Sequence, residues 1–461
     1  MTDWFLPAGG PGSPDEWCFQ TVTTADIKVY SDYQSYYDRV AALMSQAKDN
    51  NEIFLVGWAF TMYMVLTLKF GIQGPVDLKT FIKGALGRQA RVRLLLTRSH
   101  SWSDNATEVA NATSEGVTEA VIDDQLHPDT SFHQKAAFIK LDSTTNLFVG
   151  GMDITLGRRS DPGWFDVQAE IIGAGAHLGR KTLEERWESL KPPLGGLSST
   201  QQSIPQGSGD AHRVQFVRTY PPCPTDTTNW KRTYAKNGDH TYYCLLSRAI
   251  GAATKSIYIE EQFFQTMGPA PTRTNPTGGS SPRERSDVPD FPRPLEDLLQ
   301  DAISRGVKLV VVSNGRGGAA NPPLRDTLVQ TLKGGANPPV LLQVPGDKKF
   351  VHSKVWIFDD HTDDGFVVIG SANFWQPSFT STGLFAEGEF GVGFTSKVDG
   401  KSLGFEKVSF ARALRIKLWE RLRQDQDPTY TWPRDKAASL DDEIKELIKP
   451  IGGADPFTAM A

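Results

Sequence analysis

Two stretches of the chain resemble each other, and together they decide its fold. Residues 351–373 read VHSKVWIFDDHTDDGFVVIGSAN, and residues 132–153 read FHQKAAFIKLDSTTNLFVGGMD. Each has a His-x-Lys unit, then an apolar run, then a second apolar run that leads to glycine and a polar residue. Asp153 lies 20 residues after His133, and Asn373 lies 21 residues after His352. An internal repeat of this kind predicts two similar halves related by a pseudo-twofold axis.

The His-x-Lys units carry the candidate chemistry. Residues i and i+2 of a strand share a face, so the histidine and the lysine of each unit should point the same way. If the halves face each other, one pocket holds two imidazoles and two ammonium groups. Two lysines suit an anion such as phosphate, and two histidines can divide the roles of nucleophile and acid. A single unit is more often part of a solvated face, but two matched copies favour catalysis.

The rest of the chain alternates between strand and helix patterns. Strands are expected at 53–56, 92–95, 136–141, 147–149, 167–172, 214–217, 256–259, 307–312, 340–344, 355–358, 366–369 and 389–394. Helices are expected at 32–48, 78–86, from 178 onward, 240–253, 294–304, 324–332, 405–422 and 440–448. This alternation predicts an α/β protein in which helices are layered on sheets.

A segment poor in apolar residues separates the two halves. Residues 191–210 contain two adjacent prolines with serines and glycines, which is typical of a linker. The expected division is an N-terminal lobe at 1–190, a linker at 191–212, a C-terminal lobe at 213–425 and an extension at 426–461. The stretch 269–294 is expected to be a functional lid or a disordered loop. Length alone suggests about three domains, but the repeat favours two lobes that share one site.

The composition is that of an ordinary globular protein. The 461 residues are 39% hydrophobic and 22% charged, with a net charge of −5, which excludes collagen-like, coiled-coil and wholly disordered chains. Such a chain has no general attraction for nucleic acid, although a local basic pocket is compatible with it. No apolar run approaches the roughly 20 residues of a membrane span, and the first residues do not read as a signal peptide.

The cysteines indicate a reducing compartment. Cys18, Cys223 and Cys244 are an odd number without C-x-x-C spacing, so a disulfide framework is not expected. We expect them to be buried apolar side chains, with one surface disulfide as the alternative. The expected location is the cytoplasm, with peripheral contact at a membrane.

The second copy of the repeat resembles the signature of the phospholipase D superfamily. His352-x-Lys354-x-x-x-x-Asp359, followed by Gly370-Ser371-Ala372-Asn373, matches its H-x-K-x4-D (HKD) motif in full. The resemblance covers residues 25–425, and residues 150–158 resemble the eukaryotic-type variant of the first motif. Further similar segments are residues 52–58, 164–168, 257–264 and 387–390. The resemblance implies two phospholipase D-like α/β/α sandwich lobes related by pseudo-twofold symmetry, with one active site at their interface.

Three positions depart from the pattern of that superfamily. In the first copy the usual Asp falls at Lys140, and Asp142 lies two residues later on the same strand face, where it could replace that Asp in part. In the superfamily this Asp is a structural tether more than a proton donor. Phe165 stands where a His is usual, and Glu261 stands where an Asn is usual. Both replacements could alter substrate choice.

The resemblance implies a hydrolase of the phospholipase D type that works in two steps through a covalent phosphohistidine. His133 is assigned as the nucleophile and His352 as the general acid and base. The residues that would hold the phosphoryl oxygens are Lys135, Lys354, Asn373 and Asp153. Asp153 is an anion, so its alternative role is to hydrogen-bond a lysine.

The remaining motif residues have supporting roles by resemblance. Asp166 lies 33 residues after His133 and Glu389 lies 37 residues after His352, and both would fix histidine tautomers. The other supports would be Asp142, Asp359, Gly370 and Ser371. This chemistry requires no metal and no cofactor, and the acidic run 359–364 is expected to be a polar hairpin turn rather than a cation site.

Three functions remain open on the sequence. The first is cleavage of a phospholipid headgroup with water or an alcohol as acceptor, in which Phe263, Phe264, Phe374 and Trp375 either accept acyl chains or are ordinary core. The second is a nuclease or another phosphodiesterase; the acidic balance counts against nucleic acid, but the loop residues Arg273, Arg283, Arg285 and Arg293 leave it open. The third is a non-catalytic phosphate-binding protein, which two intact His-x-Lys units disfavour. We expect a monomer.

Overall fold

The computed structural model describes residues 2–7, 20–24, 26–66, 76–98, 104–126, 131–156, 163–190, 212–221, 233–236, 238–266, 293–315, 322–334, 337–345, 349–379, 387–398, 400–433, 439–451 and 455–460. The linker expected at 191–212 lies outside them except for His212, as does most of the stretch 269–294. Cys18, Cys223, Arg273, Arg283 and Arg285 also lie outside the described residues. In the described part of the chain, no helix has the length and apolar character needed to cross a bilayer.

The first lobe is built on a seven-stranded sheet with the order β2-β11-β9-β8-β3-β6-β7. Its strands are β2 (Asp26–Tyr30), β3 (Glu52–Gly57), β6 (Arg91–Thr97), β7 (Glu119–Asp123), β8 (Ala136–Lys140), β9 (Thr145–Gly150) and β11 (Gln168–Ile172). β3, β6 and β7 are parallel, and the other pairs are antiparallel. The central strand β3 is buried along its whole length, as expected for a strand covered on both faces.

The second lobe repeats this arrangement in a nine-stranded sheet with the order β1-β12-β19-β18-β17-β13-β14-β15-β20. Its strands are β1 (Val22–Thr24), β12 (His212–Thr219), β13 (Ser256–Glu261), β14 (Lys308–Asn314), β15 (Val340–Val344), β17 (Lys354–Phe358), β18 (Phe366–Gly370), β19 (Glu389–Ser396) and β20 (Thr458–Ala459). From β12 to β15 the strand order and directions match those of the first sheet. The repeat seen around the His-x-Lys units is therefore a repeat of the whole lobe.

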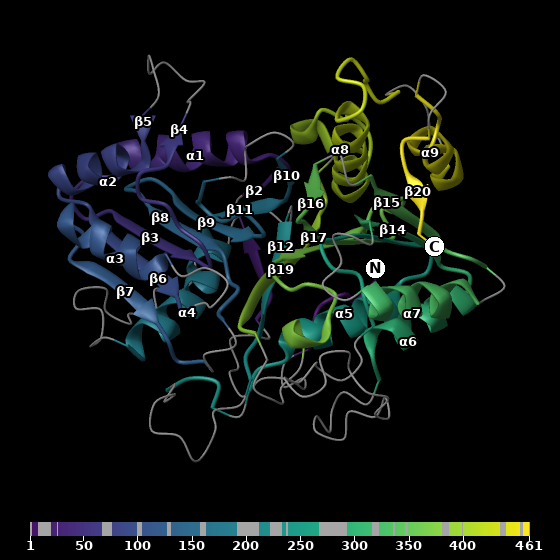
Figure 1. Ribbon diagram of the computed structural model, residues 1–461, viewed down its shortest axis with the longest axis horizontal. Coiled ribbons are helices and arrows are strands. Elements are labelled where there is room, and N and C mark those ends of the chain that lie inside the picture. The colour runs from purple at the N-terminus through teal and green to yellow at the C-terminus, as the bar shows by residue number, and fades with distance from the viewer. Residues whose placement is uncertain are drawn as a thin grey trace.

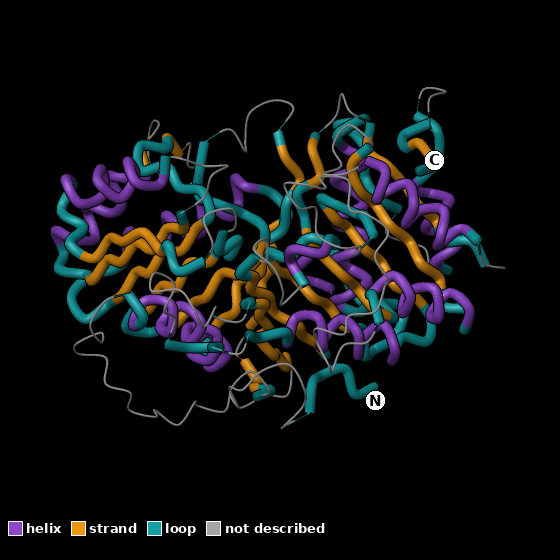
Figure 2. The backbone as a smooth tube through the Cα atoms, turned by 60° about the horizontal axis from the view of Figure 1, so that its bottom comes forward, coloured by secondary structure: helices purple, strands orange, loops and turns teal. Residues whose placement is uncertain are grey.

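Helices cover both faces of each sheet, so each lobe is an α/β/α sandwich (Figure 2). The helices are α1 (Tyr33–Gln46), α2 (Leu78–Gly87), α3 (Asn105–Ser114), α4 (Ala174–Glu188), α5 (Thr241–Ala252), α6 (Leu295–Ser304), α7 (Pro322–Lys333), α8 (Phe410–Gln424) and α9 (Leu440–Leu447). Figure 1 shows the two lobes side by side, the first in purple to blue and the second in green to yellow. The predicted α/β fold with two similar sandwich lobes is confirmed.

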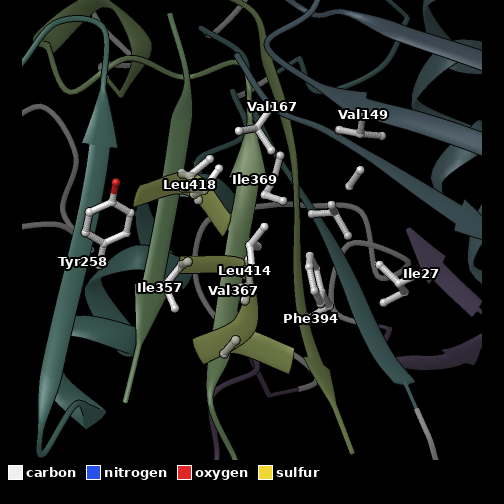
Figure 3. Close-up of a cluster of buried hydrophobic side chains, with 14 of the residues drawn as sticks. Ile27, Val149, Val167, Tyr258, Ile357, Val367, Ile369, Phe394, Leu414 and Leu418 are labelled. Atoms are coloured by element: carbon white, nitrogen blue, oxygen red, sulfur yellow. The ribbon is translucent and has the colours of Figure 1, made fainter. Parts of the chain in front are cut away.

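The two lobes share one hydrophobic core. Figure 3 shows Ile27, Val149 and Val167 of the first lobe beside apolar side chains of the second, including Ile369 and Phe394, and all of them are buried. Apolar burial on this scale is the dominant favourable contribution to folding. The two lobes therefore pack directly against each other through this core.

Helix α4 approaches the second sheet closely because two glycines face it. A Cβ at Gly175 would lie 2.9 Å from Val214, and one at Gly179 would lie 2.6 Å from Phe216, both of which are residues of β12. Real Cβ atoms do not approach other atoms so closely, so only glycine permits this packing. The glycine-rich start of α4 thus brings the lobes together.

Two short connections join the lobes beside the repeat. β10 (Trp164–Phe165) of the first lobe pairs in parallel with β16 (Phe350–Val351) of the second. Phe132 forms an isolated parallel bridge with Gly388. In each case the segment just before a His-x-Lys unit lies along the segment just before a carboxylate of the other lobe.

Some elements differ from the sequence predictions. α3 and β7 were not predicted, and α8 begins at Phe410 rather than at 405, since a 3₁₀ turn at Gly400–Leu403 precedes it and Ser409 caps it. Trp4 and β1 pack in the second lobe, and β20 of the tail pairs with β15. The boundaries drawn between lobes, linker and extension stay a prediction.

Candidate active site

The two His-x-Lys units lie at corresponding places, each just before or at the start of a central strand. The backbone N–H of His133 donates to the carbonyl of Gly388 (2.8 Å), and that of His352 donates to the carbonyl of Phe165 (2.7 Å). Gly388 immediately precedes Glu389, and Phe165 immediately precedes Asp166. Each histidine is therefore held by its main chain against the other lobe.

The carboxylates reach the histidines crosswise. His352 Nδ1 donates to Asp166 Oδ2 at 2.6 Å, although Asp166 belongs to the first lobe. His133 Nδ1 lies 3.4 Å from Glu389 Oε2 of the second lobe. All four side chains are buried. Each half of the site is incomplete without the opposite lobe.

His133 has a defined tautomer in this arrangement. Its Nδ1 lies 3.0 Å from the carbonyl oxygen of Ser371, which can only accept a hydrogen bond. The Nδ1 atom must therefore carry the proton, which leaves the Nε2 lone pair free when the ring is neutral. Burial and the positive charge of Lys135 lower the pKa of His133, so the neutral ring is favoured.

The pKa values of the two carboxylates are shifted in opposite directions. Burial raises the pKa of Asp166 to about 6, against the opposing effect of Lys354 and the hydrogen bond from Tyr33. Burial also acts to raise the pKa of Glu389, but the attraction of His133 and hydrogen bonds from Ser371 and Ser378 outweigh it and lower the pKa. Both carboxylates are therefore mainly ionised near neutral pH and can accept a hydrogen bond from a histidine N–H.

The two lysines have unlike neighbours. Lys135 Nζ donates to the carbonyl of His133 (2.7 Å) and lies 3.6 Å from Asp153 Oδ2. Lys354 Nζ donates to Gln262 Oε1 (2.7 Å) and to the carbonyl of its own histidine. Burial, aided by repulsion from Lys135, lowers the pKa of Lys354 to about 8.

Asp153 and Asn373 occupy equivalent places after β9 and β18. Asp153 Oδ1 accepts the backbone N–H groups of Trp58 and Ala59, and its other oxygen has no hydrogen bond among the described residues. The side-chain oxygen of Asn373 likewise has no hydrogen bond there, and its backbone N–H donates to Ser378. The charge of Asp153 thus faces Lys135 at ion-pair distance without a hydrogen bond between them, and its role stays a prediction.

The supporting aspartates hold the hairpins of the two lobes with unequal strength. Asp359 is buried and accepts backbone N–H groups from Thr254, Lys255 and Ser256, just before β13. Asp142 accepts from Asn51 Nδ2 (2.7 Å), just before β3, but its side chain is 58% exposed. Asp142 therefore stands at the corresponding place as a weaker tether.

The small residues of the second motif pack tightly. A Cβ at Gly370 would lie 2.4 Å from the Tyr242 hydroxyl, so this position has no room for a side chain. The Ser371 hydroxyl donates to Glu389, which orients the carboxylate toward His133. Both residues thus support the geometry around His133.

Neither candidate cation site has the character of a metal centre. Donor atoms of His133, Glu387 and Glu389 lie within 4.8 Å of one another, but Glu389 already accepts the hydroxyls of Ser371 and Ser378. In the acidic run 359–364, Asp359 holds backbone N–H groups and Asp360 pairs with Arg415 at 2.6 Å. Glu389, Asp359 and Asp360 are thus already bound by other groups of the protein.

Aromatic and basic side chains that the sequence analysis did not single out frame the site. Trp164 lies over His352 at 4.5 Å between ring centroids, and Trp58 lies edge-on to His133 at 5.7 Å. Arg421 of α8 donates to the carbonyl of Asp166 (2.8 Å) and forms a buried ion pair with Glu260. The positions of both tryptophans beside the matched segments were an available signal, whereas the contacts of Arg421 required the tertiary fold.

The aromatic residues considered for acyl chains divide into two kinds. The rings of Phe264 and Phe374 are in tilted contact, with centroids 5.0 Å apart, and are buried in the second lobe. The rings of Phe263 and Trp375 are in tilted contact at the same distance and are partly exposed. Only the second pair is available at the surface.

Comparison with solved structures supports the fold. Phosphatidylserine synthase from Haemophilus influenzae Rd KW20 has a TM-score of 0.53 at 10% identity, over 93% of this chain and 92% of that chain. Yeast tyrosyl-DNA phosphodiesterase gives 0.43 at 11% identity, over 82% and 90%. Nuc from Salmonella typhimurium, a phospholipase D family member, gives 0.27 at 17% identity, over 46% and 95%. Neither a protein-family model nor a curated protein sequence matches this chain.

The comparison thus supports the two-lobed fold, and membership of the phospholipase D superfamily stays a prediction. The phosphatidylserine synthase likeness spans nearly the whole of both chains. At 10% identity, this likeness supports a shared architecture but does not identify the substrate. The eukaryotic-type character of the first motif stays a prediction.

Proposed function

We propose that this protein is a phosphodiesterase of the phospholipase D type that cleaves the headgroup of a phospholipid. The observation that carries the proposal is the crossed pair of His-x-Lys units, in which each histidine meets a carboxylate of the opposite lobe. Two buried lysines beside two buried histidines suit an anionic phosphodiester and a proton transfer at one centre.

In the first step His133 attacks phosphorus. Its Nε2 lone pair forms the P–N bond while the bond between phosphorus and the leaving oxygen breaks, and the His352 imidazolium gives its proton to that oxygen. The 2.6 Å contact with Asp166 supports His352 as the group that holds this proton. The carbonyl of Ser371, 3.0 Å from His133 Nδ1, supports His133 as the nucleophile.

In the second step neutral His352 takes a proton from water or from an acceptor alcohol. The resulting oxygen forms a bond to phosphorus, the P–N bond breaks, and His133 is released with its Nδ1 proton in place. Lys135, Lys354 and Asn373 hold the phosphoryl oxygens through both steps. Asp153 moderates the charge of Lys135, from which it lies 3.6 Å.

A phospholipid is our choice among phosphodiesters for three reasons. The chain resembles lipid-cleaving members of the superfamily at residues 150–158 and 257–264. A protein of the same fold is a phosphatidylserine synthase. The exposed pair Phe263 and Trp375 offers an apolar surface for an acyl chain.

The test is a substrate comparison in EDTA. The protein is incubated with phosphatidylcholine vesicles plus ethanol and, separately, with single-stranded DNA. Headgroup release or phosphatidylethanol supports the proposal, whereas cleavage of DNA alone replaces it with a nuclease. His133→Asn and His352→Asn should each lose activity by more than about 10²-fold, and activity that survives either change contradicts the mechanism.

A further inference from the structure

Glu387 is a carboxyl group close to the site that the proposed mechanism does not use. It lies two residues before Glu389, and its backbone N–H donates to the carbonyl of Pro377 (2.8 Å). This contact fixes it beside the 3₁₀ turn Gln376–Ser378. As a whole residue Glu387 is partly exposed, whereas Glu389 is buried.

A single hydroxyl lies between the two carboxyl groups. Ser378 Oγ is 2.6 Å from Glu389 Oε1 and 3.2 Å from Glu387 Oε2. The same Oγ accepts N–H groups from Asn373 (3.1 Å) and from Trp375 Nε1 (2.8 Å). A serine hydroxyl has one hydrogen and two lone pairs. Its one hydrogen serves Glu389, so it cannot also satisfy Glu387.

Among the described residues, the groups around Glu387 and Glu389 place no cation between the two carboxylates. The groups that face Glu387 are Glu389 of the same strand segment, Ser378 and Trp375 of the turn, and Lys135 of the first lobe at longer range. Glu389 in turn faces His133. Two carboxylates in contact without a cation between them do not both ionise near neutral pH, so one of them holds a proton there.

We propose that Glu387 is a positioning residue that carries a proton beside Glu389, so that Glu389 remains the anion that serves His133. The inference rests on the proposed role of His133. Burial and repulsion from Glu389 raise the pKa of Glu387 well above its usual value, whereas the pKa of Glu389 is lowered. The proton is therefore assigned to Glu387 rather than to Glu389.

Loss of this proton at alkaline pH has a defined effect. A second negative charge beside Glu389 favours the cationic form of the His133 ring and raises its pKa. The same charge stabilises the cationic ring of the phosphohistidine, which slows the second step. Lys354, whose pKa is about 8, and Lys135 also act on His133, so their titration must be separated from that of Glu387.

The decisive experiment compares wild type with Glu387→Gln, which has the shape of the protonated acid. The ring of His133 is followed by NMR from pH 5 to 10, with His133→Asn for assignment, and kcat is measured over the same range. We expect kcat of Glu387→Gln at pH 7 to stay within about twofold of wild type, because the change replaces one neutral group with another. One alkaline inflection of the His133 titration should disappear, while the inflection due to Lys354 remains.

Two results overturn the proposal. One is superposition of the His133 titration curves of wild type and Glu387→Gln. The other is a loss of more than about tenfold in kcat at pH 7 in a folded Glu387→Gln variant, because ionised Glu387 would then be required. Glu406→Gln, whose side chain is 67% exposed, is the matched control and should change neither readout.

If Glu387→Gln does not fold, the His133 titration of the wild-type protein alone tests the proposal. A His133 titration with no alkaline inflection beyond that of Lys354 overturns the proposal. The titration needs no substrate, so it stays informative if no phosphodiester is cleaved. The failure of this inference and the failure of the proposed function are thereby distinguishable.

Discussion

His133 and His352 are alike in sequence context but differ in what holds each Nδ1 proton. Asp166 accepts the Nδ1–H of His352 at 2.6 Å, whereas His133 Nδ1 lies 3.0 Å from the carbonyl of Ser371 and 3.4 Å from Glu389 Oε2. The shorter carboxylate contact stabilises an imidazolium at His352 more strongly, while the carbonyl fixes the tautomer of His133. The difference between two residues thus suits one ring to proton transfer and the other to attack.

The acid limb of the pH–rate profile should report Asp166. Since burial raises its pKa to about 6, Asp166 is ionised above this pH and loses its charge below it. We expect kcat to fall below about pH 6, and Asp166→Asn to remove this limb and lower kcat by about 10²-fold or more. Asp124→Asn, at an exposed aspartate, is the control and should keep the wild-type profile. An unchanged acid limb in Asp166→Asn would contradict the assignment.

Asp153 should limit the affinity of the site for highly charged anions. Because its carboxylate lies 3.6 Å from Lys135, it offsets one of the two lysine charges. Asp153→Asn should strengthen the binding of inorganic phosphate at pH 7 by about tenfold, as measured by calorimetry. Asn373→Asp, at the equivalent place in the other lobe, should weaken it by a similar factor. Weaker binding in Asp153→Asn would instead mean that Asp153 itself contacts the anion.

At the scale of elements, the two hairpins of the repeat are tethered with unequal strength. Asp359, which is itself buried, ties the end of β17 to the start of β13 by accepting three backbone N–H groups. Asp142 makes one hydrogen bond to Asn51 and one exposed ion pair with Lys48. The departure at Lys140 therefore weakens a tether without removing the hairpin.

Paired alanine substitutions measure this difference. Asp359→Ala should lower the free energy of unfolding by about 3 kcal/mol, since it removes the shared acceptor of three backbone N–H groups. Asp142→Ala should cost less than about 1 kcal/mol, because the Asp142 side chain is itself 58% exposed. Urea unfolding of the two variants gives both values. Equal losses would mean that the first hairpin depends on Asp142 as strongly as the second depends on Asp359.

At the scale of the whole molecule, the site exists because two similar lobes of one chain close on each other. The core shown in Figure 3 joins the lobes, and the crossed contacts of Asp166 and Glu389 depend on that closure. Bringing together residues so distant along the chain costs considerable conformational entropy, and the burial of apolar side chains between the lobes must offset this cost.

A mixing experiment tests whether one chain supplies the complete site. His133→Asn and His352→Asn chains are co-expressed and assayed together. We expect activity no higher than that of either variant alone, since both His-x-Lys units and both carboxylates meet within one chain. Restored activity would indicate lobes exchanged between chains.

The sequence by itself determined the repeat, the α/β class and the residues that meet at the site. Strand periodicity is local, so the burial of β3 and β13 and the positions of His133 and His352 could be predicted from neighbouring residues. The same local patterns predicted most helices. α3 and β7 were missed, and their partly buried residues carry weaker periodicity.

Only the tertiary structure decided which carboxylate serves which histidine. Asp166 and Glu389 each follow the His-x-Lys unit of their own lobe, yet each meets the histidine of the other. The proximity of Glu387 to Glu389 through Ser378 likewise depends on how the 3₁₀ turn folds back. Hydrogen bonds and charge interactions act over a few ångströms of space rather than along the sequence, so these pairings arise only when the two lobes close.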